Sequence, residues 1–142
     1  CHLLKPSRIM QVDDPNNPTV MEHLVEALDA QPVRHKNWYL CCGKACQRES
    51  IPEDMMHDLL GTVRDEQADL LCLICPTCFG QFDHGQLQIA KRYEDMTLTP
   101  PVYYFSMLAY AQGLDYDQLG FNLQRIKPEV LQAHQASVVS DG

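Results

Sequence analysis

The sequence predicts an α/β domain with a small, mainly parallel sheet and helices on both faces. Segments with strand character alternate with segments of helical periodicity along the chain. One of the predicted strands, residues 68–74, is a continuous apolar run, which is typical of a strand that is covered on both faces. A chain of 142 residues, 45% of them hydrophobic, is large enough to bury its own core. We therefore expect one domain over residues 1–132 and a flexible tail over residues 133–142.

The first half of the chain predicts two helices and one strand. Asn17 and Pro18 have the residue types of a helix start, and apolar residues then recur at helical spacing. Residues 37–40 have the composition of a short buried strand. Ser50 and Glu53 form the sequence pattern of a capping box, which predicts that the second helix begins there.

The second half predicts two strands that are each followed by a helix. The apolar strand 68–74 leads into a helix with inward apolar positions, and residues 102–105 predict the next strand. The helix after that strand should end at Gly113, and Asp115 should cap one more short turn. The aromatic residues expected in the core are Trp38, Tyr103, Tyr104 and Phe105.

Charge and hydropathy exclude two classes of partner. Eleven Lys and Arg against nineteen Asp and Glu give a net charge of -8, which disfavours nucleic acid and anionic membranes. The apolar run 70–75 is too short to span a bilayer, so we expect no membrane span. The chain begins at Cys1 and not at Met, which indicates a fragment or a processed product. A further strand of the sheet is expected just before Cys1.

The cysteines are the unusual feature of the composition, because there are seven of them. Secreted disulfide scaffolds usually have an even number of cysteines in a shorter chain with a poor core. Here the number is odd, the core is ample and two cysteines are adjacent. A reducing compartment, which means the cytoplasm, with cysteines used for metal binding or redox chemistry, is therefore the better interpretation.

The cysteines follow the predicted strands. Cys41 and Cys42 end one strand, Cys75 and Cys78 end the next, and Cys1 would end the strand expected before it. Ligands in open α/β sheets bind beyond the carboxyl ends of the strands, so these cysteines are expected to meet at one edge. Cys75 and Cys78 also precede a helix, whose N-terminal N–H groups favour thiolate.

Each motif taken alone leaves alternatives open. Cys75-x-x-Cys78 fits half a zinc site, half an iron–sulfur site or a thioredoxin-like redox pair, and Thr99-Pro100 before a later strand also resembles thioredoxins. Adjacent cysteines strain the peptide between them when both bind one metal ion, so Cys41-Cys42 favours a multinuclear site. Two packed core cysteines remain the simpler alternative.

The remaining candidates have weaker signals. Cys72 lies inside the apolar strand and is expected to be a core residue. Cys46 follows the cysteine pair closely enough to reach a metal, and His2 could bind a metal or donate a hydrogen bond to a cluster sulfur. Lys44 and Arg48 could stabilise thiolates or contact an anionic substrate, or they could be solvated basic residues.

Taken together, the order Cys1, then Cys41-Cys42-Gly43, then Cys75-x-x-Cys78 resembles the cysteine-rich CCG domain found in the B subunit of heterodisulfide reductase. Residues 1–7, 15–18 and 101–105 are also similar to this family, so the resemblance covers most of the chain. The stretch Lys44-Ala45-Cys46 departs from the small or glycine-rich residues that often follow the cysteine pair in the family.

The resemblance implies a non-cubane 4Fe–4S cluster held by the five thiolates of Cys1, Cys41, Cys42, Cys75 and Cys78. In such subunits two CCG domains face each other, and a disulfide is split between their clusters. Because this chain has one motif, the resemblance implies that it is the C-terminal half of a two-domain subunit, or a one-domain variant.

We therefore expect an iron–sulfur oxidoreductase domain that passes electrons to a disulfide substrate and has little activity when isolated. The implied partners are a second CCG domain, a ferredoxin-like iron–sulfur subunit and a flavin-containing subunit. Two alternatives remain: a CCG subunit of a succinate:quinone-type or other flavin-linked electron-transfer complex, and a structural zinc-binding module.

Overall fold

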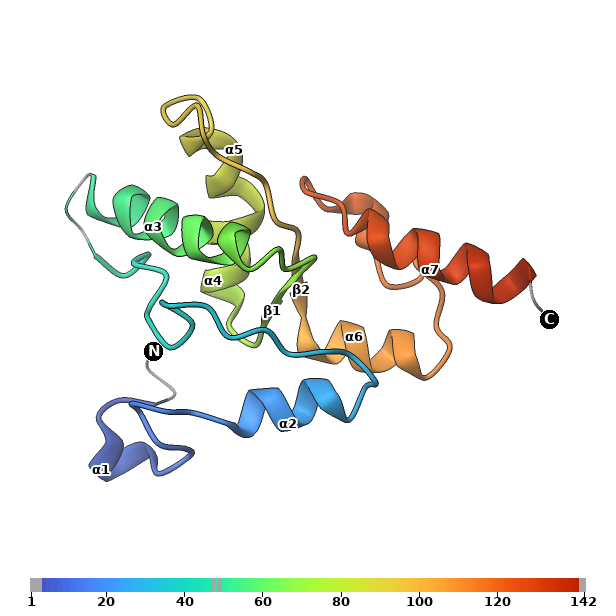
Figure 1. Ribbon diagram of the computed structural model, residues 1–142, viewed down its shortest axis with the longest axis horizontal. Coiled ribbons are helices and arrows are strands. Elements are labelled where there is room, and N and C mark those ends of the chain that lie inside the picture. Colours follow the sequence, from blue (N-terminus) through green and yellow to red (C-terminus); the bar gives the residue numbers. More distant parts are fainter. Residues whose placement is uncertain (1–3, 47, 49, 141–142) are drawn as a thin grey trace.

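The computed structural model describes residues 4–46, 48 and 50–140, and its centre is a small parallel sheet. Within these residues the sheet has two strands, β1 (Leu71–Leu73) and β2 (Pro101–Tyr103). Leu71 pairs with Pro101 and Leu73 with Tyr103. Figure 1 shows both strands in the middle of the molecule, with α3 (Ile51–Asp65) on one side and α6 (Tyr104–Ala111) on the other. The predicted α/β class, with a small parallel sheet and helices, is confirmed.

The other helices are α1 (Ser7–Met10), α2 (Val20–Glu26), α4 (Pro76–Gly80), α5 (Gln86–Ile89) and α7 (Glu129–Ser140). A π-helical turn (Gln81–Gly85) joins α4 to α5 without a break, and a short 3-10 turn (Phe121–Leu123) precedes α7. In the described part of the chain no helix is both long and apolar enough to cross a membrane.

Two apolar clusters lie against the sheet. The first joins α3, β1 and the helix that follows β1; its buried members are Cys42, Met56, Leu59, Leu60, Val63, Leu71, Phe82 and Ile89. The second joins β2 to the segments after it through Val102, Tyr116 and Phe121, with Tyr110 and Leu131 packed against them. Because one cysteine, Cys42, is part of the first cluster, the packing of α3 against β1 also positions part of the predicted site.

The helix expected after Asn17 and Pro18 begins two residues later than predicted. The carboxylate of Asp13 accepts hydrogen bonds from the N–H groups of Thr19 (2.6 Å) and Val20 (2.7 Å), which are the unpaired donors at the start of α2. An ionised carboxylate is a stronger acceptor than the neutral amide of Asn17, which accepts a hydrogen bond from Arg34 instead.

The prediction of a strand over residues 37–40 is wrong, because these residues form turns. The N–H of Trp38 donates to the carbonyl of His35 and the N–H of Leu40 to that of Asn37. Among the described residues this segment has no neighbouring strand, and a segment without a ladder partner satisfies its backbone groups locally. Trp38 lies below the Arg34 guanidinium, 4.5 Å from the ring centroid, and Leu40 is 45% exposed.

The capping box predicted for Ser50 and Glu53 is also absent. Ser50 has helical backbone angles and makes no side-chain capping bond, so its hydroxyl is not in the geometry that a cap requires. Glu53 instead accepts a hydrogen bond from Arg92 across the surface. The helix itself is confirmed, with Pro52 in its first turn.

The strand predicted over residues 102–105 ends two residues earlier than expected. β2 ends at Tyr103, and Tyr104 already begins α6. Tyr104 is buried as expected, but Phe105 is 71% exposed, because the helix turns it away from the core. The turn after α6 follows the prediction, since the Asp115 carboxylate accepts the N–H of Gln118.

The C-terminal region is helical across the predicted boundary at residue 132. α7 runs from Glu129 to Ser140, so the segment expected to be a tail is helical up to Ser140. A hydrogen-bonded connection precedes it: the Asp83 carboxylate accepts the N–H groups of Arg125 (3.0 Å) and Ile126 (3.1 Å). These bonds attach the chain that leads into α7 to the helix that follows β1.

Gln86 links that same helix to the chain that enters β2. It is fully buried, and its amide nitrogen donates to the carbonyls of Phe82 (2.6 Å) and Thr99 (2.8 Å). Its amide oxygen accepts the N–H of Thr99 (2.9 Å). The side chain therefore pairs with both backbone groups of Thr99, as a neighbouring strand would.

We expect Gln86→Leu to lower the free energy of unfolding by about 2–4 kcal/mol, because it leaves the buried N–H and carbonyl of Thr99 without partners. Denaturant unfolding of the reduced protein measures the change. Gln88→Leu is the matched control: Gln88 is exposed and bonds to His84, so its loss should stay within about 0.5 kcal/mol. Equal stabilities for the two variants would contradict the role given to Gln86.

Candidate functional site: a cysteine cluster beside the sheet

Two cysteine-bearing segments that are far apart in the sequence meet in the structure. The Sγ atoms of Cys42 and Cys78 are 3.3 Å apart, and the thiol of Cys78 donates a hydrogen bond to Cys42. The two residues are separated by 36 positions in the chain. Cys42 is buried and Cys78 is half-buried. The contact joins the Cys41-Cys42-Gly43 turn to the Cys75-x-x-Cys78 helix start.

The turn that holds Cys42 depends on Gly43. Its φ of +80° lies in the left-handed region, which glycine adopts without steric cost. The carbonyl of Gly43 accepts the N–H of Cys46 at 2.8 Å, which closes the turn. Gly43 is itself buried against Pro52 and Met55 of α3. The turn is thus positioned by α3 and not by the preceding strand that the sequence predicts.

The second segment follows β1 directly. Cys75 is the N-cap residue of α4, Pro76 occupies the first helical position, and Cys78 lies in the first turn. Hydrogen bonds from the backbone N–H groups of Cys78 and Thr77 lower the pKa of Cys75 below that of an ordinary thiol. A thiolate at Cys75 is therefore favoured by the helix start, as the sequence indicated.

The Cys42–Cys78 pair favours one thiolate and one thiol. The hydrogen bond that Cys78 donates lowers the pKa of Cys42, and the backbone N–H of Lys44 acts in the same direction. The same hydrogen bond raises the pKa of Cys78, since it stabilises the protonated form, and burial adds to this effect. Negative charge on sulfur is thus favoured at Cys42 and at Cys75.

The other predicted candidates lie apart from this contact or outside the described residues. Burial in β1 raises the pKa of Cys72 to about 11, which is the behaviour of a packed, unreactive thiol. Cys46 is half-buried beyond the Gly43 turn. Cys1 and His2 lie outside the described residues, so the predicted five-cysteine arrangement stays a prediction. Within residues 4–46, 48 and 50–140, no three His, Cys, Asp or Glu side chains are grouped as a metal site.

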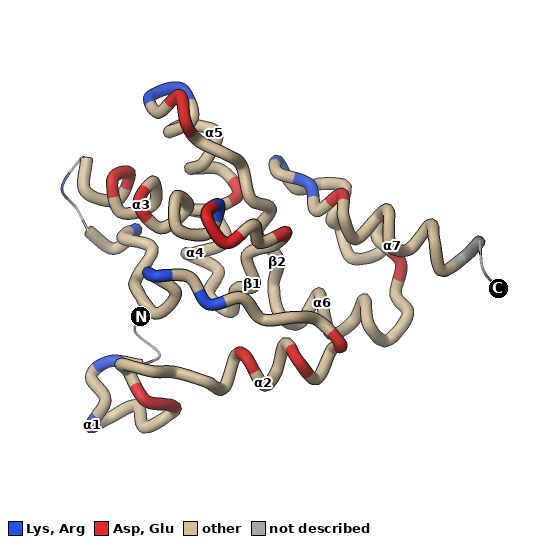
Figure 2. Tube along the Cα trace, in the orientation of Figure 1, with Lys and Arg blue, Asp and Glu red and all other residues tan. Residues whose placement is uncertain are grey.

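Lys44 and Arg48 are both exposed. The segment 30–48 contains four basic residues and no acidic ones, in a chain with a net charge of -8. Figure 2 shows these basic positions between α2 and α3, whereas acidic residues lie along both helices. Arg34 is neutralised by an ion pair with Glu22. The chain around Cys41 and Cys42 is thus less negative than the rest of the molecule.

Tyr103 also contributes to this region, although its sequence pattern predicts a core residue only. Its ring stacks on Phe79, with centroids 4.6 Å apart and an angle of 11° between the planes. Burial raises the pKa of Tyr103, and negative charge at Cys75 acts in the same direction. The predicted parallel sheet could have indicated this position. Parallel pairing of the two strands places Tyr103, the last residue of β2, beside Leu73, just before the Cys75 segment.

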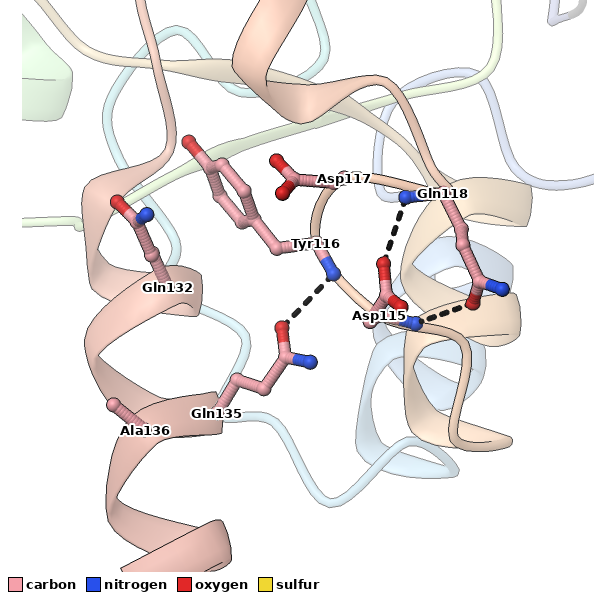
Figure 3. Close-up of a pocket in the computed structure, with 7 residues that line it drawn as sticks. All are labelled: Asp115, Tyr116, Asp117, Gln118, Gln132, Gln135 and Ala136. Atoms are coloured by element: carbon pink, nitrogen blue, oxygen red, sulfur yellow. Dashed lines mark hydrogen bonds between the residues drawn. The ribbon is translucent and has the colours of Figure 1, made fainter.

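A hollow of about 660 Å³ lies elsewhere, between α7 and the turn after α6. Asp115, Tyr116 and Gln135 are among its lining residues (Figure 3). Two hydrogen bonds join groups along it: Gln135 accepts the N–H of Tyr116, and Asp115 accepts that of Gln118. This hollow is lined by none of the candidate residues, and the Gln135 bond attaches α7 to the turn after α6.

The comparison with known families matches the cysteine-bearing part of the chain. The profile of the CCG family, described as a cysteine-rich domain, matches residues 1–83. This range contains every cysteine of the chain, including both members of the Cys42–Cys78 contact.

Curated relatives match a longer part of the chain. The B subunit of a ferredoxin/F420H2-dependent CoB-CoM heterodisulfide reductase from Methanosarcina acetivorans is 30% identical over 133 residues, covering 89% of this chain and 44% of the relative. The B subunit of a ferredoxin:CoB-CoM heterodisulfide reductase from Methanosarcina mazei is 30% identical over 131 residues, with the same shares. The 8-methylmenaquinol:fumarate reductase membrane anchor subunit of Wolinella succinogenes is 28% identical over 124 residues, 86% of this chain and 44% of the relative.

The chain thus spans less than half the length of these relatives. The profile match covers more than half of the chain and includes the Cys-Cys-Gly turn and the Cys-x-x-Cys helix start described above. This chain belongs to the CCG family of cysteine-rich domains.

Proposed function

We propose that the chain is an iron–sulfur electron-transfer domain of an oxidoreductase complex, and that it passes electrons to a disulfide substrate. The observation that supports this most directly is the 3.3 Å contact between Cys42 and Cys78, since it brings sulfur donors from two distant motifs to one place. The proposed cofactor is a non-cubane 4Fe–4S cluster, with Cys1, Cys41, Cys42, Cys75 and Cys78 as its ligands.

The donor set fits such a group. All the proposed ligands are thiols, the ligand type that iron–sulfur clusters use. Cys41 and Cys42 are adjacent, so they suit two irons of one cluster better than a single metal ion. When bound, the cluster would supply one-electron transfer and thiolate-binding iron for disulfide chemistry.

The chain itself would tune the site through hydrogen bonds and shielding. The N–H of Lys44 is directed at Cys42, and those of Cys78 and Thr77 are directed at Cys75. Hydrogen bonds to ligand sulfurs stabilise negative charge on them and so raise the reduction potential of a cluster. The stacked rings of Phe79 and Tyr103 join the helix that begins at Cys75 to the end of β2, and we propose that they shield one side of the cluster.

The proposed assembly follows from the relatives. Those named above are subunits of multi-subunit reductases, and the chain spans less than half of each. We propose a second CCG domain, a ferredoxin-like iron–sulfur subunit and a flavin-containing subunit as partners. Residues 1–132 would then form one CCG domain of a two-domain subunit, and Lys44 and Arg48 would contact charged groups of the disulfide.

The similarity to a fumarate reductase subunit supports a second candidate function, in which the domain belongs to a flavin-linked complex that reacts with a quinone. The two candidates differ in the final electron acceptor or donor. A reconstituted domain that exchanges electrons with a menaquinone analogue, and does not react with disulfides, would favour this second function.

Anaerobic purification followed by iron, acid-labile sulfide and zinc analysis tests the proposal. We expect about four irons and about four sulfides per chain, with visible absorbance from sulfur-to-iron charge transfer. Stoichiometric zinc without sulfide would instead indicate a structural zinc module. The loaded domain should show little turnover with reduced viologen and disulfides until a second CCG domain is added. Rapid turnover by a proven monomer would contradict the two-domain proposal.

A further inference from the structure

We propose that Cys42 and Cys78 are a disulfide modification site of the metal-free domain. Oxidation would link the Cys-Cys-Gly turn to the first turn of α4. This pairing goes beyond the proposed function, because it requires neither a cluster nor a partner protein.

The geometry selects this pair among the described cysteines. The two Sγ atoms are 3.3 Å apart, and the Cys78 thiol already points at Cys42, so forming a bond of about 2.05 Å requires an approach of only about 1 Å. Cys41 and Cys42 cannot readily pair, because a trans peptide holds neighbouring residues in the wrong geometry. Cys72 is half-buried and is held in β1 by the pairing with β2, which makes it a weaker competitor.

The competing pair is Cys75 and Cys78, which share one helix start. A link between them would close a very short loop, whereas Cys42 and Cys78 are 36 positions apart. Closing a longer loop removes more conformational freedom from the unfolded chain and so stabilises the folded, oxidised protein more. Cys42 is also held in the apolar cluster against α3, so its sulfur stays beside Cys78 while Cys75 is more exposed.

The oxidant is a low-molecular-weight disulfide such as oxidised glutathione. Cys78, the more exposed of the two residues, passes its proton to the Cys42 thiolate along their hydrogen bond, and its sulfur attacks one sulfur of the reagent, which forms a mixed disulfide and releases one thiolate. Cys42 then gives up that proton, attacks the Cys78 sulfur and releases the second reagent sulfur. Counted from two thiols, the cysteines lose two electrons and two protons, and one reagent disulfide becomes two thiols.

One consequence rests on the proposed function. If Cys42 and Cys78 are cluster ligands, their disulfide removes two thiolates from the ligand set. The oxidised domain would then bind no iron or sulfide until a dithiol reductant cleaves the disulfide. The disulfide would protect the two ligands from irreversible oxidation while the cluster is absent.

Peptide mapping of the wild-type protein tests the pairing. Metal-free, reduced protein is equilibrated with a glutathione redox buffer, its remaining thiols are alkylated, and it is digested with trypsin. Cleavage after Lys36, Lys44, Arg64 and Lys91 places Cys42 in peptide 37–44 and Cys78 in peptide 65–91. A Cys42–Cys78 bond joins these two peptides, whereas Cys41–Cys42 and Cys75–Cys78 bonds each lie within one peptide.

We expect the 37–44/65–91 pair to be the main disulfide-linked species, with two of the seven thiols lost. Cys41→Ser and Cys72→Ser should retain this pair, and Cys42→Ser should lose it. A main product with its bond inside peptide 65–91, or a linked pair that persists in Cys42→Ser, would overturn the proposal.

Iron loading separates this proposal from the proposed function. Reduced protein should take up iron and sulfide, and oxidised protein should do so only after dithiothreitol treatment. A cross-link in a protein that binds no iron in its reduced form would support the disulfide site and contradict the proposed function. Equal iron loading before and after reduction would overturn the protective role.

Discussion

Replacing Gly43 with alanine is expected to lower the free energy of unfolding by about 2–5 kcal/mol and to remove most of the bound iron. At a φ of +80° a side chain costs about 1–2 kcal/mol in strain. The new Cβ would also lie 3.0 Å from the sulfur of Met55 and 3.2 Å from the Cα of Pro52, which adds about 1–3 kcal/mol of overpacking. The turn would have to move away from α3, and Cys42 would move with it.

Gly113→Ala is the matched control for this variant. Gly113 has a φ of +96°, but no atom lies within 4 Å of the position of its Cβ, so this variant has the strain without the collision. Its stability loss should be about 1–2 kcal/mol, and its iron content should equal that of the wild type. Denaturant unfolding of the metal-free protein and iron analysis of the loaded protein measure both quantities. Similar losses of stability and of iron in the two variants would contradict the role of the α3 contact.

Serine at Cys42 or at Cys78 should abolish iron binding, whereas serine at Cys72 should not. A serine hydroxyl stays protonated at neutral pH and is a poorer ligand for iron than a thiolate. Cys72 lies in β1, and its raised pKa reflects burial, so Cys72→Ser places a hydroxyl in an apolar environment and costs about 1–3 kcal/mol of stability.

The three serine variants act as controls for one another, because each exchanges the same sulfur for oxygen. Iron and sulfide per chain, measured on folded protein after anaerobic loading, give the outcome. Full iron content in Cys42→Ser or Cys78→Ser would remove that residue from the ligand set. Loss of iron in Cys72→Ser with unchanged stability would mean that Cys72 is a ligand.

The elements that were predicted correctly are those whose signal lies within the element's own residues. The helix after Cys75 follows from Pro76 at its first position and from apolar residues that now lie buried, such as Phe82 and Ile89. β1 was predicted because a continuous apolar run needs cover on both faces, and the two apolar clusters provide it.

The errors arose where the result depended on a partner elsewhere in the chain. Residues 37–40 have strand-forming side chains, but no described strand lies beside them. Glu53 was predicted to cap its helix, but its carboxylate accepts a hydrogen bond from Arg92, which is distant in the sequence. Cys42 lies beside Cys78 because the Gly43 turn packs against α3, whereas the predicted strand before Cys41 is absent from the described residues; the meeting of all five cysteines stays a prediction.

The hydrogen bonds made by Asp83 and Gln86 affect which part of the chain can be transplanted into another protein. The family profile ends at residue 83, so it includes β1 but excludes β2, its hydrogen-bonded neighbour. Thr99, Arg125 and Ile126, whose N–H groups bond to Gln86 or Asp83, also lie beyond that limit. The stretch matched by the family profile therefore ends inside a hydrogen-bonded structure that continues to Ile126. A chimera that transplants residues 1–83 into another scaffold would transfer all seven cysteines while leaving β1 unpaired, so we expect a stable graft to extend at least to Ile126.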